Sequence, residues 1–321
     1  MAKKNAVAPG CELLSISAIF SDSTVLGWTF GLLIAQVILG LLIQNLKGPM
    51  QSKSAAAAHQ FACFAAFVYT AYAGTHVWLY GSSYATGASV SARYFECSPE
   101  QLTLVKMMLG FQLYDFVVTV LAADLLSAIG LVHHSVTAIF MLFALLSGSL
   151  MPYAPFFCGV AEISSLPLSI FDLFKHCPEL GRNKLLASIN EMSKVLFAAI
   201  FLVVRCVWWP VVIYHMLNDI YAAQDDPRFW MPAAAFHSIV AVGLTCLQQF
   251  WGNSAPARLD IDPWAICGLA LSSHASYQLG NALLPYTRRG GRRHHEDGQR
   301  RQEQQGRQGQ VRGFGLSREV P

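Results

Sequence analysis

The sequence predicts an all-α integral membrane protein with about seven transmembrane helices. Of its 321 residues, 54% are hydrophobic and only 13% are charged, whereas a soluble domain carries about 25% charged residues. The mean hydropathy is +0.41. Several apolar segments are long enough to cross about 30 Å of hydrocarbon at about 1.5 Å per helical residue. This composition argues against a soluble fold.

The elements follow from the apolar segments in chain order. An N-terminal segment, 1–24, is too polar for the core of a signal peptide, so the apolar run after it is expected to be a retained first helix. The seven predicted spans are 25–43, 56–80, 102–123, 126–146, 153–174, 192–217 and 229–251. An eighth apolar segment, 263–284, is interrupted by polar residues and is expected either to span, to re-enter or to lie on the membrane surface.

Residues 288–321 form an Arg-, Gly- and Gln-rich tail with almost no apolar content, a composition typical of disorder. Arginines directly after a last span are typical topology anchors, so we expect no specific nucleic-acid partner. Basic residues also flank the first and fifth connections, at Lys47, Lys53, Lys175, Arg182 and Lys184. With seven spans these loops and the tail share one side, which the positive-inside rule predicts to be cytosolic.

The cysteines are interpreted as small core residues, because most lie in apolar runs and the chain has no C-x-x-C pair. Neither a disulfide framework nor a zinc ribbon is indicated. In the first span, Gly27, Gly31 and Ala35 recur every four residues, a spacing that indicates close packing with another helix.

Ionisable residues within spans usually face the interior of the bundle and mark a site, because facing lipid is costly. Gln112, Asp115 and Thr119 share one face of the third span. The fourth span carries His133 and His134, whose side chains diverge by about 100° around a helix. They are therefore expected to line two walls of one cavity, and a metal held by this pair is disfavoured.

The later spans add Glu162, Ser165 and Ser169 on one face, with Pro167 expected to kink the helix, and Arg205 on the next span. An internal polar cavity explains these groups. The alternative is a set of structural networks, such as Asp115 held by Arg205 or Glu162 held by a histidine.

The motifs GFQLYDF (110–116), VHHSVT (132–137), AEISS (161–165) and VR (204–205), in this order, resemble the TLC-domain family, which includes the ceramide synthases. The resemblance extends over 53–251, and His59 is similar to a histidine that the family often carries. It implies six helices around a lipid-accessible cavity, in the endoplasmic reticulum or another endomembrane, with membrane lipids as partners.

The resemblance implies that His133 and His134 are catalytic if the chain is an enzyme, because ceramide synthases use paired histidines to join an acyl-CoA to a sphingoid base. Glu162 or Asp115 would orient an imidazole, whose reference pKa of about 6.5 suits a base. Arg205, Gln112, Thr137, Ser165 and His59 would contact the lipid or its headgroup. No metal or other cofactor is expected, with acyl-CoA as the co-substrate.

Ceramide synthases carry an acidic His-Asp-x-x-Asp motif after the histidines, where this chain has Ala161-Glu162 followed by Ser164-Ser165. That pattern is similar to the non-synthase TLC-domain proteins, which are tied to membrane lipid composition and trafficking. Two hypotheses follow: an acyl-CoA-dependent N- or O-acyltransferase acting on a sphingoid base or lysolipid, and a non-catalytic lipid-binding or lipid-homeostasis protein.

Overall fold

The computed structural model describes residues 14–81 and 89–259, which form helices joined by short turns, with no strand in these ranges. The helices are α1 (Ile16–Phe20), α2 (Ser23–Asn45), η1 (Gln51–Lys53), α3 (Ser54–Tyr80), α5 (Val90–Phe95), α6 (Pro99–Leu121), α7 (Ala128–Ser147), η2 (Met151–Tyr153), α8 (Ala154–Phe157), η3 (Val160–Ser164), α9 (Ser165–His176), η4 (Pro178–Arg182), α10 (Lys184–Phe201), η5 (Leu202–Trp208), α11 (Trp209–Ala222) and α12 (Met231–Leu259).

Six helical segments of the described chain are long and apolar enough to cross a membrane. They are Ile16–Asn45, Pro99–Leu121, Ala128–Ser147, Met151–His176, Lys184–Ala222 and Met231–Phe250. The chain is therefore an all-α multi-pass membrane protein, as predicted. The predicted segments 263–284 and 288–321 lie outside the described residues.

The predicted second span differs from the other six. It forms α3, a 27-residue helix, but its alanines and polar side chains place it below the hydropathy of the six apolar segments. α3 contacts α2, α6, α8, α9 and η3, and many of its buried residues are alanines, whereas Tyr69, Tyr72 and Tyr80 are exposed. Small side chains allow helices to pack closely, and alanine and tyrosine are both less hydrophobic than the leucine and isoleucine of the other spans.

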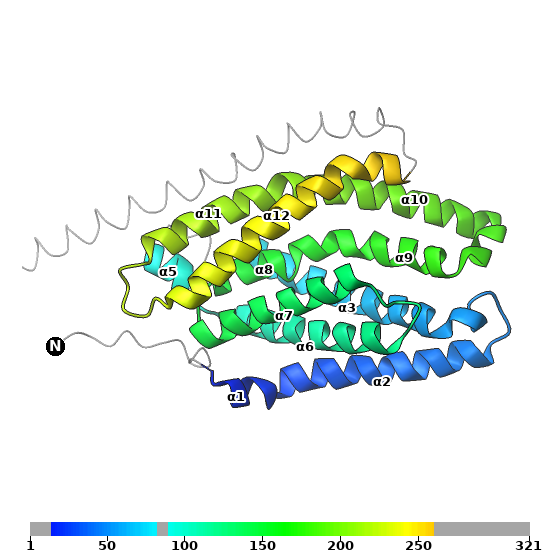
Figure 1. Cartoon of the computed structure of the whole chain (residues 1–321), viewed down its shortest axis with the longest axis horizontal. Coiled ribbons are helices and arrows are strands. Elements are labelled where there is room, and N and C mark those ends of the chain that lie inside the picture. The colour runs from blue at the N-terminus through cyan, green and yellow to red at the C-terminus, as the bar shows by residue number, and fades with distance from the viewer. Residues whose placement is uncertain (1–13, 82–88, 260–321) are drawn as a thin grey trace, which may run out of the picture.

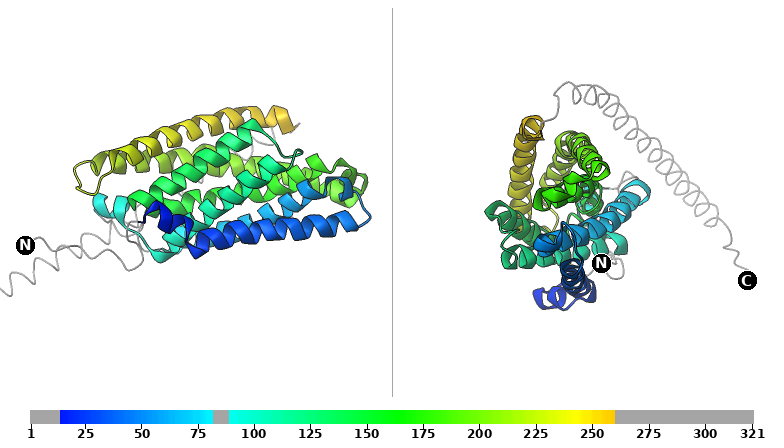
Figure 2. Two further views of the ribbon diagram at one scale, coloured as in Figure 1. Left: turned by 60° about the horizontal axis from the view of Figure 1, so that its bottom comes forward. Right: turned by 90° about the vertical axis from the view of Figure 1, so that its right-hand side faces the viewer.

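The helices run along a common long axis, so that the connections gather at two ends of the bundle (Figure 1). Seen from one end, α2, α3, α6 and α7 lie on one side of the bundle and α9 to α12 on the other (Figure 2, right). At one end, Lys53 Nζ lies 2.6 Å from Asp124 Oδ1 and joins two connections. At the other, Arg93 on α5 pairs with Asp219 on α11 at 2.6 Å.

Local capping determines where several helices begin. Asp22 caps α2 by accepting from the Thr24 amide at 2.9 Å, and its other oxygen accepts from Lys106 Nζ at 2.7 Å. Ser98 forms a capping box with Gln101 at the start of α6. Lys106 thus has a partner on α2, consistent with its lying on the face of α6 away from Asp115.

Close helix packing uses glycines other than the predicted ones. A Cβ at Gly27 or Gly31 would meet no atom within 4 Å, so the predicted packing stripe is not a contact face here. A Cβ at Gly74 or at Gly159 would instead collide with the Cα of the other residue. The backbone of α3 therefore touches the chain directly before η3, which only glycine at both positions allows.

Cys97 is disulfide-bonded, which corrects the expectation that all cysteines are core residues. Its position next to α5 places this bond at the end of the bundle that carries Arg93 and Asp219. Cys63 and Cys158 are free and buried, as predicted for cysteines in apolar runs. Cys206 is only partly buried and Cys246 is exposed, so for these two the prediction of a core position is wrong.

Candidate functional site

Three helices contribute to a buried cluster that we call the histidine–aspartate cluster: His59, Cys63, Asp115 and His134. His59 Nε2 donates to Asp115 Oδ1 at 2.6 Å, and Cys63 Sγ lies 3.4 Å from the same ring nitrogen. His134 Nε2 lies 3.3 Å from Asp115 Oδ2. The carboxylate of Asp115 is thus held between two imidazoles from α3 and α7.

Gln112 fixes the orientation of His134. One turn before Asp115 on α6, its amide oxygen accepts from His134 Nδ1 at 2.8 Å, while its amide nitrogen donates to Met108 Sδ at 3.4 Å. The Nδ1 atom of His134 must therefore carry a proton. Its Nε2 atom is left to face Asp115.

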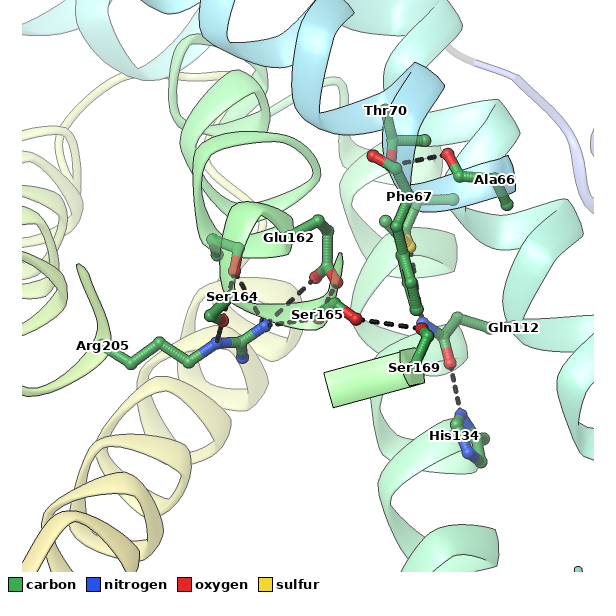
Figure 3. A network of polar contacts seen from close by, with 12 residues as sticks. Ala66, Phe67, Thr70, Gln112, His134, Glu162, Ser164, Ser165, Ser169 and Arg205 are labelled. Atoms are coloured by element: carbon green, nitrogen blue, oxygen red, sulfur yellow. Dashed lines mark hydrogen bonds and ion pairs between the residues drawn. The ribbon is translucent and has the colours of Figure 1, made fainter. Parts of the chain in front are cut away.

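A second group, which we call the arginine cluster, comprises Arg205, Glu162, Ser164 and Ser165. Arg205 Nε donates to Ser164 Oγ at 2.8 Å, and its Nη2 lies 3.4 Å from Glu162 Oε1 (Figure 3). Ser165 Oγ donates to the other oxygen of Glu162 at 2.6 Å. The partly buried guanidinium and carboxylate therefore neutralise one another and share serine partners.

Irregular backbone positions the arginine cluster. The fifth span is broken by the 3₁₀ segment η3, which carries Glu162 and Ser164 and ends three residues before Pro167. The carbonyl of Ala161 leaves the helical ladder and accepts from Arg205 Nη2 at 3.0 Å. The span is thus irregular directly before Pro167, as predicted. The carbonyl that Pro167 leaves without an amide donor is that of Ile163, four residues earlier, whereas the Ala161 carbonyl is satisfied by the Arg205 side chain.

Arg205 itself lies in η5, a π-helical segment of the sixth span. Pro210 follows at the start of α11 and has no amide hydrogen to donate to Cys206, four residues earlier. The Gln249 side chain on α12 donates to that carbonyl at 2.9 Å. Such π segments are frequent at functional sites, and here the wider turn carries the arginine.

Between these groups lies a cavity of about 60 Å³, which we call the chamber. Its walls combine polar groups with a larger apolar surface. The polar lining residues are Gln112, His133, Thr137, Glu162, Arg205 and Gln248. Phe140, Phe157, Trp209, Ile213 and Leu244 form much of the apolar lining. The volume holds a few water molecules and lies well below the roughly 300 Å³ of a typical enclosed ligand pocket.

Two buried atoms of the chamber lining have no hydrogen-bond partner within the described part of the chain: His133 Nδ1 and Gln248 Oε1. Leaving a buried polar atom unpaired costs about 1–3 kcal/mol. The charged groups of both clusters are already paired. A ligand in the chamber therefore gains the most binding free energy by forming hydrogen bonds with these two atoms.

The structure brings all nine predicted site residues to the two clusters or the chamber. His59, Gln112, Asp115 and His134 form one group, Glu162, Ser165 and Arg205 form another, and His133 and Thr137 line the chamber. The two adjacent histidines diverge as predicted, because they contact different surroundings. His133 faces the chamber, and His134 faces Asp115.

The pairings differ from the sequence-based alternatives. Asp115 is held by two histidines instead of Arg205, and Glu162 is held by Arg205 instead of a histidine. Asp115 does orient an imidazole, but it is that of His134. His133, the imidazole that lines the chamber, has no carboxylate partner among the described residues. A complete acid–histidine pair facing the chamber is therefore not formed.

Three residues of the site were not predicted. Cys63 lies one turn after His59, a spacing that indicates a shared helix face. Ser164 stands between Glu162 and Ser165 in the same motif. Gln248 is a polar residue within a predicted span, and that signal alone was sufficient to nominate it.

A separate open groove of about 420 Å³ lies between α3 and the start of α6. Tyr69, Tyr72 and His76 line it, together with Glu100. These aromatic residues, which share a face of α3, thus belong to a different surface from the chamber.

The sequence model of the TLC domain, of the TRAM, LAG1 and CLN8 group, matches residues 50–254. No curated protein and no solved structure matches the chain. The matched range includes α3 to α11 and most of α12, and so both clusters and the chamber. Because it covers well over half of the sequence, the chain belongs to the TLC-domain family of multi-pass membrane proteins.

Proposed function

We propose that the chain binds a membrane lipid, with the polar headgroup in the chamber and the hydrocarbon chains among the apolar helices. The observation that carries this proposal is the pair of unpartnered atoms, His133 Nδ1 and Gln248 Oε1, on the walls of a chamber whose charged lining groups, Glu162 and Arg205, are already paired with each other. A headgroup that offers hydroxyl or amide hydrogens to Gln248 removes the cost of leaving its oxygen unpaired.

The size of the chamber supports a headgroup in preference to an acyl chain. A volume of about 60 Å³ accommodates a few polar atoms, so the hydrocarbon must leave the chamber between helices. Exposed apolar side chains on the outer faces of the spans, such as Ile139 and Val242, provide a surface of matching chemistry.

The experiment compares Gln248→Leu with the wild type and with Gln249→Leu. Each full-length protein is purified in mild detergent, and bound lipids are extracted and quantified by mass spectrometry. Gln248→Leu removes an unpaired acceptor, so it keeps or raises thermal stability while it loses bound lipid several-fold. Gln249→Leu removes a bond to Cys206 and is expected to lower stability without selectively removing lipid. Equal lipid content in Gln248→Leu and the wild type contradicts the proposal.

A second candidate function is acyl transfer, favoured by the free imidazole of His133. A buried neutral histidine facing a chamber suits a general base. It would take a proton from an amine or hydroxyl acceptor as that atom attacks the thioester carbonyl of acyl-CoA. The new amide or ester bond forms, the C–S bond breaks, and the CoA thiolate leaves and takes up a proton.

Labelled acyl-CoA and a panel of sphingoid bases and lysolipids distinguish the two functions. An acyltransferase turns over with the wild type and loses turnover at least 100-fold in His133→Ala, with unchanged activity in His76→Ala, whose imidazole lies in the separate groove. Absence of turnover on every acceptor, with lipid still bound, leaves lipid binding without catalysis.

We further propose an endomembrane location, such as the endoplasmic reticulum, with the Lys53 and Asp124 end in the cytosol. Lys47, Lys53, Lys175, Arg182 and Lys184 gather at that end, as the positive-inside rule requires. The disulfide-bonded Cys97 at the opposite end is consistent with an oxidising lumen.

A further inference from the structure

The histidine–aspartate cluster has the donors and the spacing of a metal site. His59 and Cys63 are one helical turn apart on α3, so their side chains lie on one face. Donor atoms of His59, Cys63 and Asp115 all lie within 4.8 Å of one another, and the three residues are buried. The argument against a metal from the divergent His133 and His134 does not apply to this set.

A fourth donor, His134 on α7, lies outside this group of three and approaches it at Asp115. His134 Nδ1 donates to Gln112, as established above, so only Nε2 is available to the cluster. That nitrogen lies 3.3 Å from a carboxylate oxygen of Asp115. Gln112 holds the ring as outer partners of metal-bound histidines do.

We propose that His59, Cys63, Asp115 and His134 bind one zinc-class divalent ion. Two imidazoles, a thiolate and a carboxylate are the ligand types of zinc, and four protein ligands are typical of a structural site. Tetrahedral coordination separates sulfur and nitrogen donors by about 3.5 Å. The Cys63 to His59 and His134 to Asp115 distances of 3.4 and 3.3 Å match, and the 2.6 Å between His59 and Asp115 lengthens as the ion enters.

The charges of the proposed ligands match a divalent ion. On binding, the Cys63 thiol releases its proton, because zinc binds the thiolate, and His59 binds through Nε2 with its proton on Nδ1. The thiolate and the Asp115 carboxylate together offset the two positive charges of the ion. A cluster inside a helical bundle can therefore hold the ion without the cost of a buried net charge.

The ion would join α3, α6 and α7 and would stabilise the wall behind the chamber. None of its four ligands lines the chamber, and Gln112 alone contacts both. The proposal therefore goes beyond lipid binding or acyl transfer. It does not depend on either function, so experiments that exclude one of them leave it unchanged.

The experiment measures zinc in the full-length protein, purified without chelators, by inductively coupled plasma mass spectrometry. Cys63→Ala removes the sulfur donor but leaves the His59–Asp115 bond. Cys158→Ala is the matched control, because Cys158 is equally buried and contacts Met141 instead of the cluster. The wild type and Cys158→Ala are expected to hold about one zinc per chain, and Cys63→Ala less than a tenth of that amount.

Cobalt provides a second readout on the wild-type protein itself. After zinc is removed and replaced by cobalt, coordination by Cys63 gives a sulfur-to-metal absorption band in the near ultraviolet that Cys158→Ala retains. A chelator is expected to lower the unfolding temperature of both. If the wild type holds no more zinc than Cys63→Ala, or shows no cobalt–thiolate band, the proposal is wrong.

Discussion

Asp115 and His134 face one another across α6 and α7 with 3.3 Å between carboxylate oxygen and ring nitrogen, and Asp115 also accepts from His59 at 2.6 Å. One carboxylate therefore joins three helices of the TLC domain inside the bundle. The adjacent His133 faces the chamber instead. The two neighbouring histidines thus have different surroundings, and their replacement has different consequences.

Asp115→Asn is expected to destabilise the protein by about 3–5 kcal/mol, because it removes one partner from a buried charged network. The measurement is thermal or denaturant unfolding in detergent. Asp124→Asn is the control, since Asp124 pairs with Lys53 on the surface at the same distance of 2.6 Å. An exposed pair contributes about 0–1 kcal/mol. Equal effects of the two substitutions would contradict a central role for Asp115.

Gly159→Ala is expected to destabilise the bundle by at least about 1–3 kcal/mol through overpacking. The new methyl group would meet the Cα atom of Gly74 and the carbonyl oxygens of Pro155 and Thr70, so α3 has to move. Gly27→Ala is the matched control, because nothing lies within 4 Å of its Cβ position. Both are compared by unfolding temperature, and a Gly159→Ala protein as stable as Gly27→Ala would rule out the close helix contact.

Arg205→Leu is expected to destabilise the protein by about 1–3 kcal/mol, since it leaves the partly buried carboxylate of Glu162 without its cation. The double variant Arg205→Leu, Glu162→Gln should recover part of that stability. Lipid binding is measured on both proteins. If the guanidinium contacts the headgroup, the double variant remains impaired in binding after its stability returns. Restored binding would assign Arg205 a purely structural role.

Opposite ends of the bundle are expected on opposite sides of the membrane. Gly181→Cys places a thiol in the basic connection, where a Cβ meets nothing within 4 Å. Asp225→Cys places one in the exposed α11–α12 connection. In cells whose plasma membrane is permeabilised while the internal membranes stay sealed, a membrane-impermeant maleimide should label Gly181→Cys and should not label Asp225→Cys. Labelling of both from one side would overturn the seven-pass arrangement.

The sequence predicted the helices well, because a span is defined by the length of an apolar segment. It also predicted that His133 and His134 diverge, because helical periodicity fixes the angle between neighbours. It did not predict which helices face one another. Rotation and register between helices depend on contacts such as Gly74 with Gly159, and these determined that Asp115 pairs with histidines and Glu162 with Arg205.

The irregular helical segments were the other part of the fold that the sequence predicted incompletely. Pro167 predicted a disruption, but the π segment around Arg205 follows from the combined effect of Pro210 and of Gln249 on another helix. Cys63 was interpreted as a core residue because its apolar surroundings in sequence concealed its contact with His59.

The most direct test of a lipid headgroup in the chamber is photo-crosslinking with a lipid that carries the reactive group on its headgroup. The full-length protein is labelled in vesicles, and the crosslinked peptides are identified by mass spectrometry. The account predicts crosslinks to the chamber residues of α7 and α12, around His133 and Gln248, that excess unlabelled lipid prevents. Crosslinks confined to the groove around Tyr72 and His76, or to outer faces of the spans, would contradict it.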